Sequence, residues 1–121
     1  MSETALIGKR LPAIDALGKT TGQAVYLQDM RPPGMLYGKV LRSPHPHARV
    51  RSVDTSRAEK LPGVKTVVGG GNAPRIPYGI SIQDELPVAV DRVRYIGDEV
   101  ALVAAISEEI AAEALGLIRV E

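Results

Sequence analysis

The sequence predicts an α+β domain in which bent, mixed strands are covered by two short helices. The chain has 121 residues, of which 45% are hydrophobic, with no phenylalanine, tryptophan or cysteine. Its core must therefore be built from Val, Ile, Leu and Ala, and Val and Ile favour strands. Short apolar runs bounded by Gly and Pro predict many strands, whereas only two segments have helical patterns. These helices do not alternate regularly with the strands, which excludes a series of βαβ units.

The first part of the chain is predicted to be an extended arm. Residues 1–22 have no sustained periodicity and contain several Gly and Pro residues, so we assign them to an arm preceding a single domain at 23–121. A short strand is expected at 24–27. It should end before the turn at 31–34, because two prolines fix their φ angles there and a glycine follows them.

The middle of the chain alternates apolar and polar residues, as half-buried strands do. A short helix is predicted at 56–61, with Asp54 or Thr55 as its N-cap and Pro62-Gly63 as its stop. The expected strands around this helix are 35–43, 49–54 and 64–68.

The last third begins with an irregular segment and ends with the strongest patterns. Residues 69–87 are rich in Gly and Pro and predict a loop. A helix is predicted at 108–115, capped by Ser107 and ended by Gly116. The strands expected here are 88–90, 93–96, 100–106 and 117–121. The last of these strands runs to the final residue, so we expect the chain to be part of a longer protein.

Composition and charge exclude several classes of function. Without cysteine, this segment cannot hold a disulfide framework or a Cys-ligated metal or iron–sulfur cluster. No apolar run is long enough to span a membrane and no secretory signal is visible, so we expect a cytoplasmic protein. Residues 1–60 hold 10 Lys and Arg against 5 Asp and Glu. These basic residues alternate with apolar ones as on a strand face, and few aromatic residues are available for stacking, so nucleic-acid binding is not expected.

The candidate chemical motifs are weak. The glycines at 69–71 follow a strand, but prolines follow them and no Gly-Lys-Ser/Thr is present, so a flexible connection is favoured over a nucleotide site. His45 and His47 could be a metal pair, but no further His or Cys exists to complete the site. Adjacent carboxylates at 84–85 and 98–99 should point to opposite faces of a strand, which does not suit an acid–base pair. We therefore predict no catalytic, cofactor-binding or metal-binding residue, and a structural or interaction domain.

Five segments taken together resemble one known family. Residues 7–16, 21–26, 41–48, 61–64 and 93–101 are similar, in order and spacing, to the start of the large subunit of molybdenum hydroxylases. This is the xanthine dehydrogenase/aldehyde oxidase family, which includes carbon monoxide dehydrogenase and 4-hydroxybenzoyl-CoA reductase. The positions that carry the resemblance, for which we expect structural or interface roles, are Gly8, Lys9, Asp15, Gly22, Arg42, Ser43, Pro44, His45, His47, Pro62, Gly63, Arg94, Tyr95 and Gly97.

The resemblance implies the α/β-hammerhead domain at the N-terminus of an oxidoreductase subunit. Such a parent would bind molybdopterin, expected in its cytosine dinucleotide form, and pass electrons to [2Fe–2S] and FAD on partner domains or subunits. The hammerhead domain would pack against the remainder of the molybdenum subunit and the iron–sulfur partner, with no catalysis of its own. The alternative is a free-standing binding module or a barrel-sandwich-like carrier domain, for which Lys19 is the one loosely suitable attachment residue.

Overall fold

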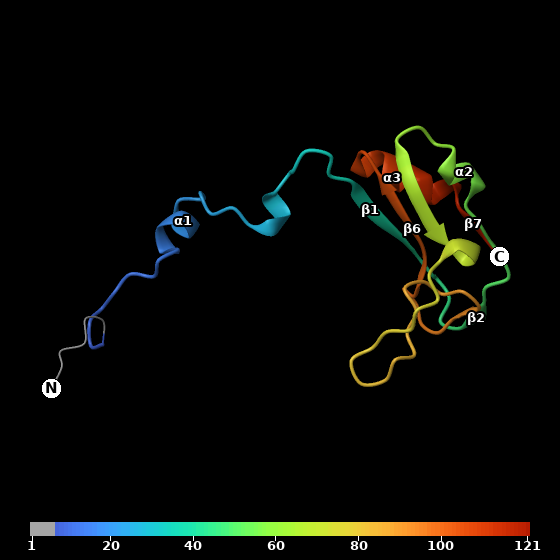
Figure 1. Cartoon of the computed structure of the whole chain (residues 1–121), viewed down its shortest axis with the longest axis horizontal. Helices are drawn as coiled ribbons and strands as arrows, with labels where there is room; N and C mark the ends of the chain where they lie inside the picture. Colours follow the sequence, from blue (N-terminus) through green and yellow to red (C-terminus); the bar gives the residue numbers. More distant parts are fainter. Residues whose placement is uncertain (1–6) are drawn as a thin grey trace. The chain divides into compact units, whose positions relative to one another are not determined.

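The computed structural model describes residues 7–121, and the chain divides into two units. The N-terminal unit is Met1–Pro33 and the C-terminal unit is Gly34–Glu121 (Figure 1). The boundary between arm and domain predicted at residue 22 stays a prediction.

The N-terminal unit contains two short helical segments where the sequence predicted extended chain. Helix α1 is Ala16–Thr20, and the 3-10 helix η1 is Leu27–Asp29. The strand predicted at 24–27 is therefore wrong. The physical reason is local, because the Asp29 carboxylate accepts a hydrogen bond of 2.9 Å from the backbone N–H of Tyr26 and closes a turn.

The C-terminal unit is built on a three-stranded antiparallel sheet in the order β1-β6-β4. Its strands are β1 (Tyr37–Arg42), β4 (Val64–Gly69) and β6 (Glu99–Ala105). The strands predicted at these three places are confirmed. The central strand β6 has the most continuous apolar sequence, as expected for a strand with neighbours on both sides.

Two smaller sheets extend this unit. Strand β2 (Ala48–Arg49) pairs with β5 (Arg92–Val93), and β3 (Val53–Asp54) pairs with β7 (Arg119–Val120). The single strand predicted at 49–54 is wrong because the chain changes partner within it. The N–H of Val50 donates to the carbonyl of Asp91 at 3.0 Å, whereas that of Arg51 donates to the carbonyl of Glu121 at 2.7 Å.

The strands predicted at 88–90, 93–96 and 117–121 are absent or shorter than expected. Segment 88–90 has no strand, although the N–H of Ala89 donates to the carbonyl of Glu99 at 2.6 Å. The other two reduce to β5 and β7. Between η2 (Gly70–Asn72) and β5, the chain forms a long loop with one isolated bridge between Tyr78 and Glu85.

Both predicted helices of this unit are present. Helix α2 is Ser56–Glu59 and helix α3 is Glu108–Leu117. The Ser107 hydroxyl accepts a hydrogen bond of 3.3 Å from the N–H of Ile110, as its predicted capping role requires. Gly116 does not end α3, because its backbone keeps a negative φ and the helix continues to Leu117. No helix among residues 7–121 is long and apolar enough to cross a membrane.

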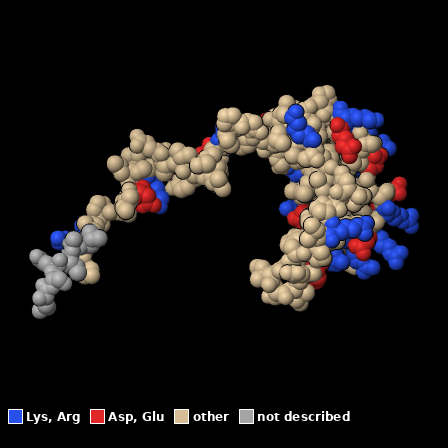
Figure 2. Space-filling model, in the orientation of Figure 1, with Lys and Arg blue, Asp and Glu red and all other residues tan. Residues whose placement is uncertain are grey.

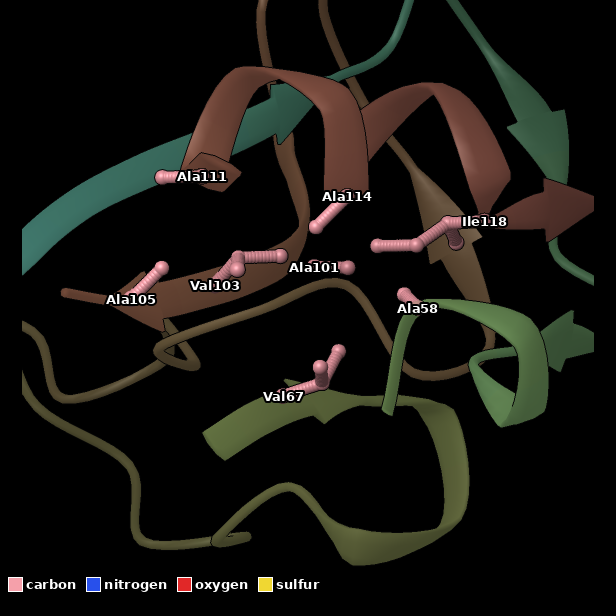
Figure 3. Close-up of a cluster of buried hydrophobic side chains, with 8 residues drawn as sticks. All are labelled: Ala58, Val67, Ala101, Val103, Ala105, Ala111, Ala114 and Ile118. Atoms are coloured by element: carbon pink, nitrogen blue, oxygen red, sulfur yellow. The ribbon is translucent and has the colours of Figure 1, made fainter. Parts of the chain in front are cut away.

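The main core lies between the three-stranded sheet and the two helices α2 and α3 (Figure 3). It consists of aliphatic side chains, most of them alanines that allow close approach of helix and sheet: Ala58, Val67, Ala101, Val103, Ala105, Ala111, Ala114 and Ile118. A second, smaller cluster joins Ala89, Val93 and Val100. The predicted aliphatic core is thus confirmed.

The opposite face of the sheet also carries apolar side chains. Val40, Leu102 and Val68 are cross-strand partners on β1, β6 and β4. Because successive residues of a strand point to opposite faces, these three lie away from Val67 and Val103, which face α3. They are half-buried and belong to neither core cluster. We call these three residues the open-face strip.

Candidate functional site

The two most distinctive sequence segments, 41–48 and 93–101, meet at one end of the three-stranded sheet. The backbone N–H of Ser43 donates to the carbonyl of Asp98 at 2.9 Å, and the N–H of Gly97 donates back to the carbonyl of Ser43 at 2.9 Å. This reciprocal pair extends the β1–β6 pairing beyond the bulge at Arg42. The two segments therefore fix each other's backbones.

Arg42 adds a side-chain link between the same segments. Its Nη1 donates to the carbonyl of Gly97 at 2.7 Å and to Oε1 of Glu99 at 2.6 Å. The Tyr95 hydroxyl donates to the other carboxylate oxygen of Glu99 at 3.4 Å. We call Arg42, Ser43, Gly97 and Glu99 the motif clasp.

The clasp favours the ionised form of Glu99. Burial of this carboxyl opposes ionisation, but a backbone hydrogen bond and the Arg42 guanidinium outweigh burial and hold the pKa of Glu99 below its ordinary value. The negative charge of Glu99, together with burial, raises the pKa of the Tyr95 hydroxyl. Tyr95 therefore stays protonated and donates to Glu99, and this hydrogen bond helps to keep the pKa of Glu99 low.

Tight turns shape both sides of the clasp. Ser43 is 5% exposed, and its Oγ accepts from the N–H of His45 at 3.0 Å and donates to the His45 carbonyl at 3.1 Å. Pro44 lies between these two residues. On the other segment, an Asp98 carboxylate oxygen accepts from the N–H of Arg94 at 2.9 Å. Asp98 precedes β6 and is not on a strand, and it lines the same cavity as Glu99, so the prediction that neighbouring strand positions separate these two carboxylates does not apply.

Pro62 and Gly63 occupy a separate turn, between α2 and β4. Gly63 has a φ of +95°, and a Cβ atom there would lie 2.7 Å from Cδ1 of Ile110 in α3. The Gly63 carbonyl accepts from the N–H of Ile106 at 3.0 Å. This turn fixes the entry to β4 against the start of α3 and does not join the clasp.

The remaining motif positions lie in the N-terminal unit. Gly8, Lys9, Asp15 and Gly22 are all exposed. Asp15 forms an ion pair of 2.5 Å with Lys19, one turn later in the chain.

The two histidines lie in the loop between β1 and β2 and are exposed. They are not on a strand, so the two-residue spacing does not place both rings on one face. Within residues 7–121, no group of three or more His, Cys, Asp or Glu could hold a metal ion.

Two cavities adjoin the clasp. The first, of about 300 Å³, is mainly apolar and has His45, Val50, Val93 and Ile118 in its walls. The second, of about 210 Å³, is acidic, with carboxylates from two segments around Arg94 and Tyr95: Asp84, Glu85, Asp98 and Glu99.

Two solved structures share this fold and define the class of domain. Quinoline 2-oxidoreductase from Pseudomonas putida 86 matches 94% of this chain with a TM-score of 0.83 and 33% sequence identity. Reconstituted CO dehydrogenase from Oligotropha carboxidovorans matches the same share with a TM-score of 0.84 and 33% identity. In these structures the match covers only 16% and 15% of the longer chain. The fold is therefore that of a domain found in molybdenum hydroxylases, as the sequence resemblance implied.

The family model described as "Aldehyde oxidase and xanthine dehydrogenase, a/b hammerhead domain" matches residues 21–121, and the chain belongs to this family. It is 53% identical over 108 residues to a probable xanthine dehydrogenase subunit of Bacillus subtilis (strain 168). It is 39% identical over 117 residues to the nicotinate dehydrogenase large molybdopterin subunit of Eubacterium barkeri. These matches cover 88% and 96% of this chain, which spans only 14% and 28% of the length of the two relatives.

The clasp and its acidic cavity do not fit the phosphate of the molybdenum cofactor that the family implies. A pterin phosphate needs cationic side chains or a cluster of backbone N–H donors. The Arg42 guanidinium already donates to Glu99 and Gly97, and the neighbouring cavity is lined by four carboxylates. The four carboxylates would repel a phosphate, and the Arg42 guanidinium is already bonded to one of them.

The sequence did not predict the clasp. Arg42 and Glu99 are 57 positions apart, and their identities alone do not pair them among the many charged residues of the chain. The one available signal was that segments 41–48 and 93–101 both belong to the family pattern. That pattern indicates that each segment matters, but it does not indicate that the two are in contact.

Proposed function

We propose that the chain is the N-terminal structural domain of the catalytic subunit of a molybdopterin-dependent oxidoreductase of the xanthine dehydrogenase/aldehyde oxidase type. Family membership over residues 21–121 and the much longer relatives support this proposal. The parent would be a hydroxylase or dehydrogenase, and this segment alone would not catalyse the reaction. The role of the segment would be to pack against the molybdenum domains and the iron–sulfur partner.

The observation that carries the structural role is the open-face strip on the sheet. A three-stranded sheet with one face covered by helices normally has a polar second face. Here Val40, Leu102 and Val68 line up across all three strands instead. The motif clasp holds the end of β1 and the start of β6, and so fixes this apolar surface in one shape. We therefore assign structural and interface roles to the motif residues.

The cofactors and partners follow from this proposal. The parent would hold molybdopterin, in its cytosine dinucleotide form, outside the residues described. It would transfer electrons to [2Fe–2S] and FAD on partner domains or subunits, and would work in the cytoplasm. The name of the Eubacterium barkeri relative, a large molybdopterin subunit, supports the first of these points.

The carrier alternative is not favoured. A carrier lysine must be free at the tip of a hairpin, but Lys19 lies inside helix α1 and forms an ion pair with Asp15. The intact mass of the native protein would reveal any acyl group on this residue.

The size and metal content of the native polypeptide test the proposal. An antibody against this domain should detect a band several times larger than 12.9 kDa in the source cells. The protein purified with that antibody should contain molybdenum. A band at the size of the 121-residue chain, with no molybdenum protein co-purifying, would contradict the proposal.

A further inference from the structure

The N-terminal unit exposes most of its large apolar side chains. Neither α1 nor η1 contains a buried residue. Ile14 and Leu27 are 105% and 84% exposed, and several other apolar side chains are more than half exposed: Ile7, Leu11, Leu17, Val25 and Met30. On the face of this unit visible in Figure 2, most of the described surface belongs to uncharged residues. None of residues 7–33 is buried, so this segment has no core of its own.

Several polar side chains of the same segment bond within it. The Thr20 and Thr21 hydroxyls donate to the carbonyls of Ala16 and Leu17 at 2.8 and 2.7 Å. Asp15 pairs with Lys19, also inside this unit. In the second half of the segment, Asp29 caps the N–H of Tyr26 and Arg31 donates to the carbonyls of Gln28 and Met30. A segment whose polar groups bond internally while its apolar groups point outward is suited to lying on an apolar surface.

These helical segments cannot persist alone. Helix α1 has five residues, and isolated helices shorter than about 12 residues are marginal in water. Burial of apolar side chains must therefore supply the missing stabilisation. The surface that buries them has to be rich in apolar groups, because burial stabilises an apolar side chain only where it is removed from water.

We propose that residues 7–33 form a docking strap that lies on an apolar surface of the remaining part of the same large subunit. The inference rests on the proposed function, because that function supplies the longer chain. The matches to relatives and solved structures cover 88–96% of this chain, more than Gly34–Glu121 alone can provide. The relatives thus carry the same segment within chains several times longer. A strap tethered to its own docking surface meets it at millimolar effective concentration, so modest apolar contacts suffice.

Hydrogen–deuterium exchange tests the strap. The full-length protein is purified with its molybdenum content measured, and compared with the 121-residue chain. The reporting amides are the helical N–H groups of Lys19, Thr21 and Met30. We expect these amides to exchange at least about tenfold more slowly in the full-length protein, and to exchange freely in the short chain at every concentration.

Matched variants in the full-length protein locate the contact. Leu17→Ser and Leu27→Ser together should return the three strap amides to free exchange. The control is Ile80→Ser, which makes the same kind of change at a fully exposed isoleucine in the C-terminal unit. This control should leave exchange in the strap unchanged.

Other outcomes would overturn the inference. Concentration-dependent protection in the short chain would mean that a second copy covers the strap. Protection that appears only when the iron–sulfur partner is added would mean that the partner covers it. Free exchange in a full-length, molybdenum-containing protein would overturn the strap and leave the proposed function intact. A native polypeptide of this chain's own size, without molybdenum, would overturn both.

Discussion

At the scale of single residues, the motif positions of the C-terminal unit act mainly on the backbone. Ser43 bonds to both polar backbone atoms of His45, and Arg42 bonds to the carbonyl of Gly97 as well as to Glu99. These side chains hold two distant segments in one geometry. Removing either side chain should therefore lower the free energy of unfolding.

Neutralising Glu99 should change how stability depends on pH. Its pKa is lowered by folding, so it stabilises the folded state above its ordinary pKa of 4.5 and loses that contribution as the pH falls below this value. Glu99→Gln should lower the Tm at pH 7 and reduce the fall in Tm between about pH 5 and 3. Thermal unfolding across this range measures both effects. Glu113→Gln, on the exposed face of α3, is the control, and an identical pH profile for the two variants would contradict the role of Glu99.

Removing the Ser43 hydroxyl should destabilise the C-terminal unit more than a surface change does. Ser43→Ala deletes both bonds to His45 at a position that is 5% exposed, for an expected loss of about 1–2 kcal/mol. Urea unfolding gives the free energy of unfolding. Ser81→Ala, at an exposed loop position, should change it by less than about 0.5 kcal/mol. Equal values for the two variants would show that the turn at Ser43 does not depend on its hydroxyl.

At the scale of elements, the sequence predicted the strands and helices whose apolar residues follow the face that is buried. Strand β6 and helix α3 were predicted at nearly their observed bounds, because a long apolar run and an apolar stripe each match the core that they face. The failures came from interactions that periodicity does not encode. Within 49–54 the chain changes hydrogen-bonding partner, and near Tyr26 a single carboxylate bond replaces a strand with a 3-10 turn.

Gly63→Ala should disturb the packing of α3 on the sheet. A positive φ costs a non-glycine residue about 1–2 kcal/mol, and the new Cβ would also meet Ile110 at 2.7 Å. Gly97→Ala is the matched control, since Gly97 has a φ of +97° but nothing within 4 Å of the added Cβ. We expect both variants to lose stability, and Gly63→Ala to lose more. Chemical denaturation measures the difference, and a smaller loss for Gly63→Ala would show that Ile110 moves aside without cost.

Val103→Ala tests whether the main core stabilises the C-terminal unit. Val103 is 2% exposed and packs between the sheet and α3 (Figure 3). Shortening it removes two methyl groups from this core, at an expected cost of about 1.5 kcal/mol. Calorimetry should show a lower Tm for the variant. Its far-UV circular dichroism spectrum should be unchanged. A Tm equal to that of the unchanged chain would mean that this core is not formed in solution.

At the scale of the whole molecule, the sequence predicted the family and the kind of role but not the contacts that perform it. The family segments are continuous in sequence and can be recognised without a structure. The clasp and the open-face strip join residues from strands far apart in the chain, and which strands pair is decided by the fold as a whole. Charges alone could not have selected Glu99 as the partner of Arg42, because the chain contains 14 Asp and Glu residues.

The open-face strip predicts that one substitution has different effects on stability in the 121-residue chain and in the full-length parent. Leu102 lies half-buried on the face away from α3 and belongs to neither core cluster, so Leu102→Ser should destabilise the 121-residue chain less than it destabilises the parent. In the full-length protein the same side chain would be buried against another domain, and its loss should cost about 1.5–3 kcal/mol. Thermal unfolding of both proteins, each with and without the change, gives the comparison. Val103→Ala is the control, since its effect should be similar in the short chain and in the parent. If Leu102→Ser destabilised the two proteins equally, the strip would belong to the domain's own core and would not be an interface.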